Sequence, residues 1–266
     1  MIRSSIERYH PADSFLHADS FPSVWCPGCG IGTAIYAFIE AIKEENIGPN
    51  KIGVVSGIGC TGKVAECLKL KTYSVTDGNV VDYAVQLKKK NQDLTVAVFL
   101  NNADFLLSGA KDFIEAGKRR ANLIVIYVNN FICPISENKV FPITPFMRMS
   151  IDNEFELPFN IPHLAKSCGA GYIARWTPIH AGWMKYSLIE AISKKGFSVI
   201  EVVSPCLIYN ANDGRIQDAI DRMNFYNDNS VMKNGEPTEN LDLRSQNNVI
   251  VGKFVDSEEK AGRIQR

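Results

Sequence analysis

The stretch TVAVFLNNADFLLSGAKDFIEAGKRRANLIVIYVNN, residues 95–130, decides the fold of this chain. It contains two short apolar runs, at 95–100 and 123–128, and each predicts a buried β-strand. Between them, the cations of K-R-R at 118–120 suit the C-terminal end of a predicted helix. IGVVS at 52–56 and FSVIEVV at 197–203 predict two more strands. Nearly continuous apolar runs are typical of parallel strands that are covered on both faces.

Helical patterns alternate with these strands. Three segments have apolar residues at three- and four-residue steps, which predicts amphipathic helices. The residues of these three faces are Ile35, Phe38, Ile39 and Ile42; Val80, Val81, Ala84 and Leu87; and Leu188, Ile189 and Ile192. We therefore expect an α/β fold, with a mostly parallel sheet sandwiched by helices.

Composition narrows the class of protein. The 266 residues are 45% hydrophobic and 22% charged, which is ordinary for a globular chain with a real core. Lys plus Arg and Asp plus Glu both number 29, and this balance argues against a nucleic-acid partner. The sequence has neither an apolar run long enough to span a membrane nor the apolar segment of a secretory signal. We expect a cytoplasmic protein.

Two segments depart from the strand–helix alternation. Residues 129–156 contain three prolines and little helical periodicity, which predicts a long and functional loop. Residues 225–248 are rich in Asn, Asp, Glu and Ser. We expect one α/β domain over 1–224 and an irregular C-terminal arm over 225–266, which either covers a neighbouring surface or is disordered.

Cysteines supply the first chemical signal. W-C-P-G-C-G-I-G at 25–32 gives Cys26 and Cys29 the C-x-x-C spacing of two ligands to one metal or cluster. A redox dithiol, a structural zinc site and chance are the alternatives. Gly28 and Gly30 could let the backbone approach a ligand ahead of a helix at 33–46.

Two further cysteines follow predicted strands. Cys60 comes after the strand at 52–56, and Cys206 comes after the strand at 197–203. A small core residue is the simpler interpretation of an isolated cysteine. Four cysteines on the loops of one sheet edge would, however, suffice for a cubane cluster.

The basic residues have simpler explanations. Lys63 is not a Walker lysine, because Val64 stands where Ser or Thr is required. K-K-K at 88–90 and K-R-R at 118–120 are interpreted as solvated helix ends, with a docking patch for an acidic partner as the less favoured alternative.

Taken together, the motifs resemble those of one enzyme family. C-P-G-C-G at 26–30, S-G-I-G-C at 56–60, V-N-N at 128–130, S-P-C at 204–206 and V-I-V-G-K-F-V-D at 249–256 occur in this order. The chain resembles the β subunit of 2-oxoacid:ferredoxin oxidoreductases. That family binds thiamine diphosphate with magnesium, and its cluster-bearing members hold a [4Fe-4S] cluster on four cysteines. The four matching positions are Cys26, Cys29, Cys60 and Cys206, whereas Cys67, Cys133 and Cys168 match none.

The resemblance also implies a reaction and partners. A 2-oxoacid is decarboxylated oxidatively, coenzyme A takes the acyl group, and the cluster passes electrons to ferredoxin or a ferredoxin-like subunit. An α subunit completes the enzyme. Lys63 matches a basic position that faces the substrate carboxylate in relatives, with a surface lysine as the alternative.

Around the diphosphate the chain departs from the family pattern. T-D-G-N at 76–79 replaces T-H-G-R, and N-N-A-D at 101–104 replaces G-D-G-D. The positions aligned with cofactor contacts are Gly28, Gly30, Asp77, Gly78, Ala103, Asp104 and Asn129, and those aligned with magnesium ligands are Asn102, Asn130 and Ile132. Asn102 removes a carboxylate, Ala103 adds a methyl group, and Asp77 adds a negative charge near the phosphates. A diverged iron–sulfur subunit without functional thiamine diphosphate is therefore the alternative function.

Overall fold

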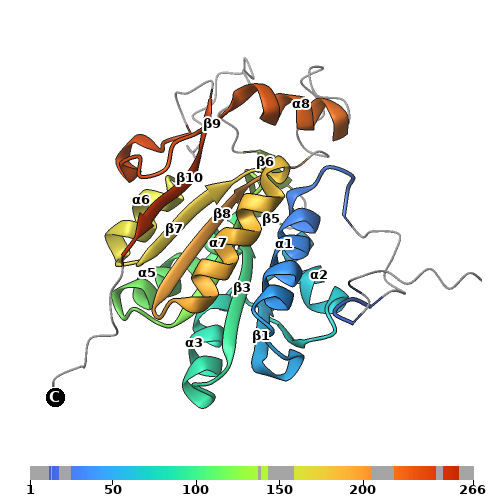
Figure 1. The fold of residues 1–266 in the computed structure, drawn as a ribbon, viewed down its shortest axis with the longest axis vertical. Coiled ribbons are helices and arrows are strands. Elements are labelled where there is room, and N and C mark those ends of the chain that lie inside the picture. The colour runs from blue at the N-terminus through green and yellow to red at the C-terminus, as the bar shows by residue number, and fades with distance from the viewer. Residues whose placement is uncertain are drawn as a thin grey trace, which may run out of the picture.

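The computed structural model describes residues 12, 14–17, 25–136, 139–142, 159–204, 206, 219–243 and 248–257. Its centre is an eight-stranded sheet in the order β2-β1-β3-β4-β8-β7-β10-β9 (Figure 1). The strands are β1 Ile52–Ser56, β2 Lys71–Ser74, β3 Thr95–Asn101, β4 Leu123–Asn129, β7 Tyr172–Trp176, β8 Phe197–Val203, β9 Ser230–Met232 and β10 Val249–Asp256. All neighbouring pairs are parallel except β10 with β7. The predicted α/β class with a mostly parallel sheet is confirmed.

Helices cover both faces of the sheet. One core packs the strands against α1 Gly30–Glu44, α2 Gly59–Cys67 and α7 Ala181–Ser193. The other packs them against α3 Val80–Lys90, α5 Ala110–Lys118 and α6 Ile161–Cys168. In β4, Ile124 and Ile126 belong to the first core, while Val125 and Tyr127 belong to the second. This alternation is why the central strands are apolar at nearly every position.

The four strands predicted from apolar runs are β1, β3, β4 and β8. The basic runs are helix ends, as expected: α3 ends at Lys90 and α5 at Lys118, and the Lys88 ammonium donates to the carbonyls of Gln92 and Leu94. Part of the loop predicted over 129–156 is instead a hairpin of β5 Ile132–Ser136 and β6 Lys139–Pro142. Residues 143–158 lie outside the described part of the chain.

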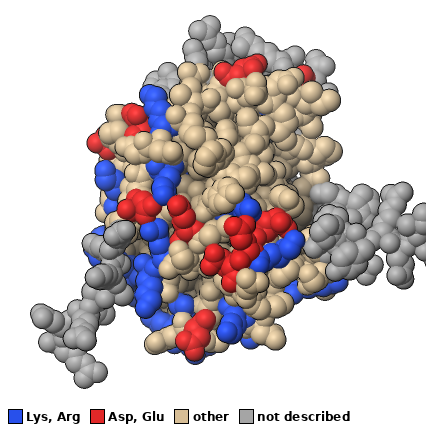
Figure 2. All heavy atoms as spheres, in the orientation of Figure 1, with Lys and Arg blue, Asp and Glu red and all other residues tan. Residues whose placement is uncertain are grey.

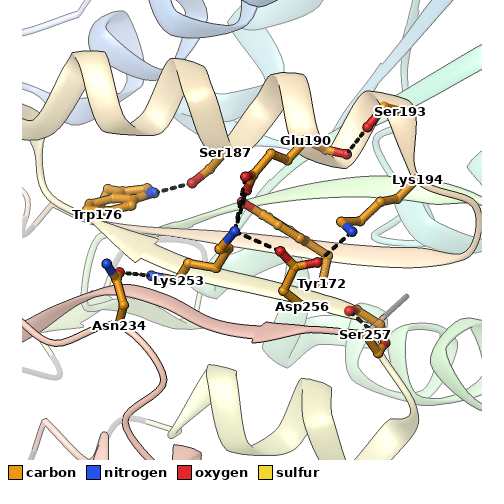
Figure 3. Close-up of polar contacts among 11 residues, drawn as sticks. Tyr172, Trp176, Ser187, Glu190, Ser193, Lys194, Asn234, Lys253, Asp256 and Ser257 are labelled. Atoms are coloured by element: carbon orange, nitrogen blue, oxygen red, sulfur yellow. Dashed lines mark hydrogen bonds and ion pairs between the residues drawn. The ribbon is translucent and has the colours of Figure 1, made fainter. Parts of the chain in front are cut away.

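The expectation of irregular structure after residue 224 is wrong for most of the described residues there. The boundary at 224 falls inside α8 Ala219–Asn229, and β10 joins the central sheet by pairing with β7. Figure 3 shows the polar contacts that attach this strand: the Lys253 ammonium donates to Glu190 at 3.0 Å and to Asp256 at 2.7 Å. Tyr172 donates to Glu190 at 2.7 Å, and Lys194 pairs with Asp256. The polar segment before β10 concealed this strand.

The surface has no single-sign face in the view of Figure 2. Acidic and basic residues lie side by side over its lower part, and its upper part is mainly uncharged. Exposed large apolar side chains occur on α1, on the short helix η4 Pro178–His180, on α7 and on α8, and they are Tyr36, Ile179, Trp183, Tyr186 and Ile220. Among the described residues, no helix is long and apolar enough to cross a membrane.

The Lys253 cluster gives a stability prediction. Replacement of Lys253 by Met should lower the free energy of unfolding by about 1 kcal/mol at neutral pH, because the side chains are one third exposed and solvent weakens their attraction. Hydrogen bonds from Lys194 and Lys253 lower the pKa of Asp256. The contribution is therefore present above the unfolded-state pKa of about 3.9 and is lost as the pH falls through the lower folded-state value.

Urea denaturation of both proteins between pH 3 and pH 8 measures this difference. The matched control is Lys89→Met, at an exposed position on α3 at the other end of the sheet, where we expect a change within about 0.5 kcal/mol. Equal losses in both variants at neutral pH would contradict the role of Lys253.

Candidate functional site

The C-P-G-C segment forms a tight turn immediately before α1. The Cys29 amide donates to the Cys26 carbonyl at 3.0 Å, and Gly28 has φ +80°. A Cβ at Gly28 would lie 3.0 Å from the Cβ of Ala219 at the start of α8. Glycine is therefore required here both for the left-handed backbone and for the close approach of α8.

Gly30 brings this turn against the chain that follows β8. Its amide donates to the Ser204 hydroxyl at 2.8 Å, and an added Cβ would lie 2.7 Å from the Cβ of Ser204. Two residues further on, the Cys206 amide donates to the Asn130 carbonyl at 3.1 Å. The loop after β4, the segment after β8 and the Cys26–Cys29 turn therefore meet at one end of the sheet.

Cys60 joins them from α2. It lies in the first turn of this helix, after Gly59 with φ +64°, and its carbonyl accepts a hydrogen bond from the Trp25 indole at 2.8 Å. Trp25 directly precedes Cys26, so this bond joins two of the cysteine-bearing segments.

The four thiols act on one another electrostatically. Burial, and to a smaller extent the negative charges of the other three thiolates, raise the pKa of the Cys29 thiol to about 11. The pKa of Cys60 is raised by burial and by the charges of Cys206 and Cys26. Thiols bind metals as thiolates, so these four would need cationic partners in order to ionise together.

Four thiols are the donor set that an iron–sulfur cluster takes. Within the described residues, no three His, Cys, Asp or Glu side chains form a site for one ion. A [4Fe-4S] cluster is held by four separate thiolates, so its cysteines surround it and do not converge on one point. Cys67 and Cys168 are buried, and among the described residues the charges that act on their pKa values do not include those of the four thiols. Cys133 lies in β5, and its side chain is outside the described part of the structure.

Beside the cysteines, Asn102 occupies the position aligned with the magnesium carboxylate. It is 3% exposed, and its amide oxygen accepts hydrogen bonds from the backbone amides of Asn130 at 2.9 Å and Phe131 at 3.2 Å. Its amide nitrogen donates to Asn129 at 3.0 Å. Phe131 has φ +56°, so this turn is held in a backbone conformation that is uncommon outside glycine.

The orientation of these amides is determined by a buried ion pair. The Asn129 side chain donates to Glu201 at 2.7 Å, and Glu201 accepts from Arg175 at 2.6 Å. Glu201 can only accept, so Asn129 must turn its nitrogen toward Glu201 and its oxygen toward Asn102. Sequence reasoning missed Glu201 and Arg175; the available signal was one charged residue inside each of two otherwise apolar runs.

The Asn102 side chain does not fit a magnesium ligand in this arrangement. An amide oxygen has two lone pairs, and backbone donors occupy both. Magnesium would have to displace at least one of these hydrogen bonds, at a position that also lacks a carboxylate.

Asp104 holds two loops together. Its carboxylate accepts from the Ile58 amide at 2.7 Å, from the Asn101 amide at 3.0 Å and from the Thr61 hydroxyl at 3.1 Å. Burial raises the pKa of Asp104, and these hydrogen bonds oppose the rise. Together with Asn101, it forms a capping box at the N-terminal end of the short helix α4 Asn102–Asp104, in which each side chain accepts a hydrogen bond from the backbone amide of the other residue.

The other predicted contacts lie around this edge. Ala103 has helical backbone angles, so the backbone strain expected from an alanine in place of glycine is absent at this position. Asp77 is exposed and accepts from the Asn79 amide, while Gly78 has φ +81° and adjoins Ser108.

Lys63 and Ile132 complete the predicted set. Lys63 is exposed one turn after Cys60, and its charge lowers the pKa of that thiol. Ile132 begins β5.

Comparisons with known proteins agree with this architecture. Residues 57–202, more than half of the chain, match the family described as thiamine pyrophosphate enzyme, C-terminal TPP binding domain. The 2-oxoglutarate synthase subunit KorB of Methanocaldococcus jannaschii is 32% identical over 94% of this chain and 93% of its own length. The subunit of the same name from Archaeoglobus fulgidus is 34% identical over 72% of this chain and 73% of its own length.

A solved structure shares the fold. The 2-oxoglutarate:ferredoxin oxidoreductase from Magnetococcus marinus, with 2-oxoglutarate, coenzyme A and succinyl-CoA bound, superposes with a TM-score of 0.77 at 20% identity and covers 97% of this chain and 88% of its own. With the sequence relatives, this establishes that the chain belongs to the β subunits of the 2-oxoacid:ferredoxin oxidoreductases, an oxidoreductase family within the thiamine pyrophosphate enzymes.

Proposed function

We propose that this chain is the cluster-bearing β subunit of a 2-oxoacid:ferredoxin oxidoreductase. Its complex oxidatively decarboxylates a 2-oxoacid, transfers the acyl group to coenzyme A and passes electrons to ferredoxin. The observation that carries the proposal is the gathering of four thiols from three separate segments at one end of the sheet. Cys26, Cys29, Cys60 and Cys206 would hold a [4Fe-4S] cluster.

The cluster would supply one-electron transfer, and the chain would supply its surroundings. The Trp25–Cys60 hydrogen bond and the Gly30–Ser204 hydrogen bond fix the relative positions of the three cysteine segments. The partial burial of Cys26, Cys29 and Cys206 restricts the access of water to the thiols.

We also propose that the chain works together with an α subunit. The relatives that it matches are themselves named as subunits. The exposed aromatic side chains of α1 and α7, two helices that pack side by side, offer an apolar area to such a partner. Purification from the native source should give a hetero-oligomer by mass photometry, and a lone chain that decarboxylates 2-oxoacids would contradict this.

The ligand set is tested by Cys206→Ser. We expect the anaerobically prepared wild-type complex to contain about four irons for each copy of this chain at the site, and the variant to lose most of them or to show an altered visible spectrum. Cys168→Ser is the matched control, because Cys168 is buried away from the group. Unchanged iron content and spectrum in Cys206→Ser would remove Cys206 from the ligand set.

A second candidate function is favoured by Asn102. An iron–sulfur electron-transfer subunit without functional thiamine diphosphate would keep the four cysteines and tolerate an amide whose oxygen is bonded to the backbone. The buried ion pair that orients Asn129 stabilises this arrangement.

Asn102→Asp distinguishes the two candidates. If the chain is the diverged subunit, the new carboxylate would face the Asn129 oxygen, and neither the wild-type complex nor the variant should show magnesium-dependent binding of thiamine diphosphate. Calorimetric titration of the assembled complex, also with Ala103→Gly added, provides the measurement. If the chain belongs to a working enzyme, the variant complex should bind thiamine diphosphate more tightly than the wild-type complex by roughly one to two powers of ten. This factor corresponds to one charge-assisted contact of about 1.5–3 kcal/mol.

A further inference from the structure

Helix α8 lies across the cysteine turn. In Figure 1 it is at the top of the view, beyond the ends of the central strands and near the loop that enters α1. Ala219, in its first turn, sits against Gly28, where an added Cβ would come within 3.0 Å of the Ala219 Cβ. Ala219, Arg222 and Tyr226 are three and four residues apart, so they share one face of the helix.

Tyr226 places a buried hydroxyl next to the cysteine turn. The residue is 0% exposed, and the Arg222 guanidinium and the Ser204 hydroxyl lie beside its oxygen as donors that lower its pKa, while its own proton has no acceptor among the described residues. The charge of the Cys29 thiolate and that of the Arg222 guanidinium both act on its pKa, which burial raises, so these groups are its neighbours. A buried O–H donor without an acceptor destabilises the fold, and a bound acceptor would remove that penalty.

Arg222 is also buried with unsatisfied hydrogen-bond donors, and it carries a positive charge. It is 4% exposed, and its Nε and Nη2 atoms make no hydrogen bonds within the described residues. Burying a guanidinium whose N–H donors lack acceptors destabilises the folded state unless an anion lies nearby. Four thiolates around a cluster would provide that negative charge, and the shared helix face directs Arg222 and Tyr226 toward the Cys26–Cys29 turn.

We propose that Tyr226 and Arg222 form a polar cover for the cluster: the Tyr226 hydroxyl donates a hydrogen bond to a sulfur on the Cys29 side, and Arg222 offsets the negative charge. This rests on the proposed cluster at the four cysteines. Hydrogen bonds and positive charge near the sulfurs stabilise the reduced and more negative state, so both residues raise the reduction potential. Both are positioning residues, since neither is a ligand.

Tyr226→Phe removes a single oxygen atom and is the direct test. In the complete complex we expect unchanged iron content and a more negative midpoint potential in an EPR-monitored titration. The ratio of reduced to oxidised cluster at a fixed solution potential should fall about tenfold, which for one electron corresponds to about 59 mV. Tyr83→Phe, on α3 at the other face of the sheet, is the matched control and should leave the potential unchanged.

Arg222 is tested with a pair of variants. Arg222→Met should shift the potential in the same direction as Tyr226→Phe, whereas Arg222→Lys, which keeps the charge, should recover most of that shift. A Tyr226→Phe complex with full iron content and the wild-type potential would overturn the polar cover. A wild-type complex without iron at these cysteines would instead refute the proposed cluster, so the two failures are distinguishable.

Discussion

The buried Arg175–Glu201 ion pair is the interaction on which this end of the molecule depends. Both side chains are 0% exposed, and their closest atoms are 2.6 Å apart. Removing two charges from water costs free energy, so a buried ion pair persists only where its remaining polar atoms also find hydrogen-bond partners. Here Glu201 orients Asn129, Asn129 orients Asn102, and Asn102 accepts the amides of the turn after β4. Arg175 also donates to the Leu241 carbonyl, which ties the C-terminal segment to the same group.

This chain of contacts explains why two neighbouring sites differ. The cysteine side presents thiols whose ionisation is disfavoured until cations arrive, because burial and mutual repulsion raise the pKa values of Cys29 and Cys60. The Asn102 side presents an oxygen that is already satisfied by backbone donors. The first arrangement gains from binding a positively charged group, whereas the second loses hydrogen bonds on binding one.

Much of the architecture could be predicted from local pattern. β1, β3, β4 and β8 are apolar at nearly every position because two cores enclose them, and that requirement is visible in the sequence. β2, with its exposed ends, lacks such a run, and β10 follows a polar segment whose composition is typical of loops. Their places in the sheet are set by pairing with β1 and β7, which no local pattern encodes.

The candidate site also has a part that could be predicted from the sequence and a part that could not. Motif resemblance pointed to four cysteines, and parallel strands bring Cys206 and the loop after β4 to one edge. Neither the pattern nor the resemblance could show that Asn102 faces backbone amides, because that depends on Glu201 and Arg175, 26 residues apart in sequence and adjacent in the sheet. The charge in FSVIEVV is tolerated only because YIARW supplies its partner, so a single ionisable residue in an apolar run indicates a spatial pair that the linear sequence leaves unidentified.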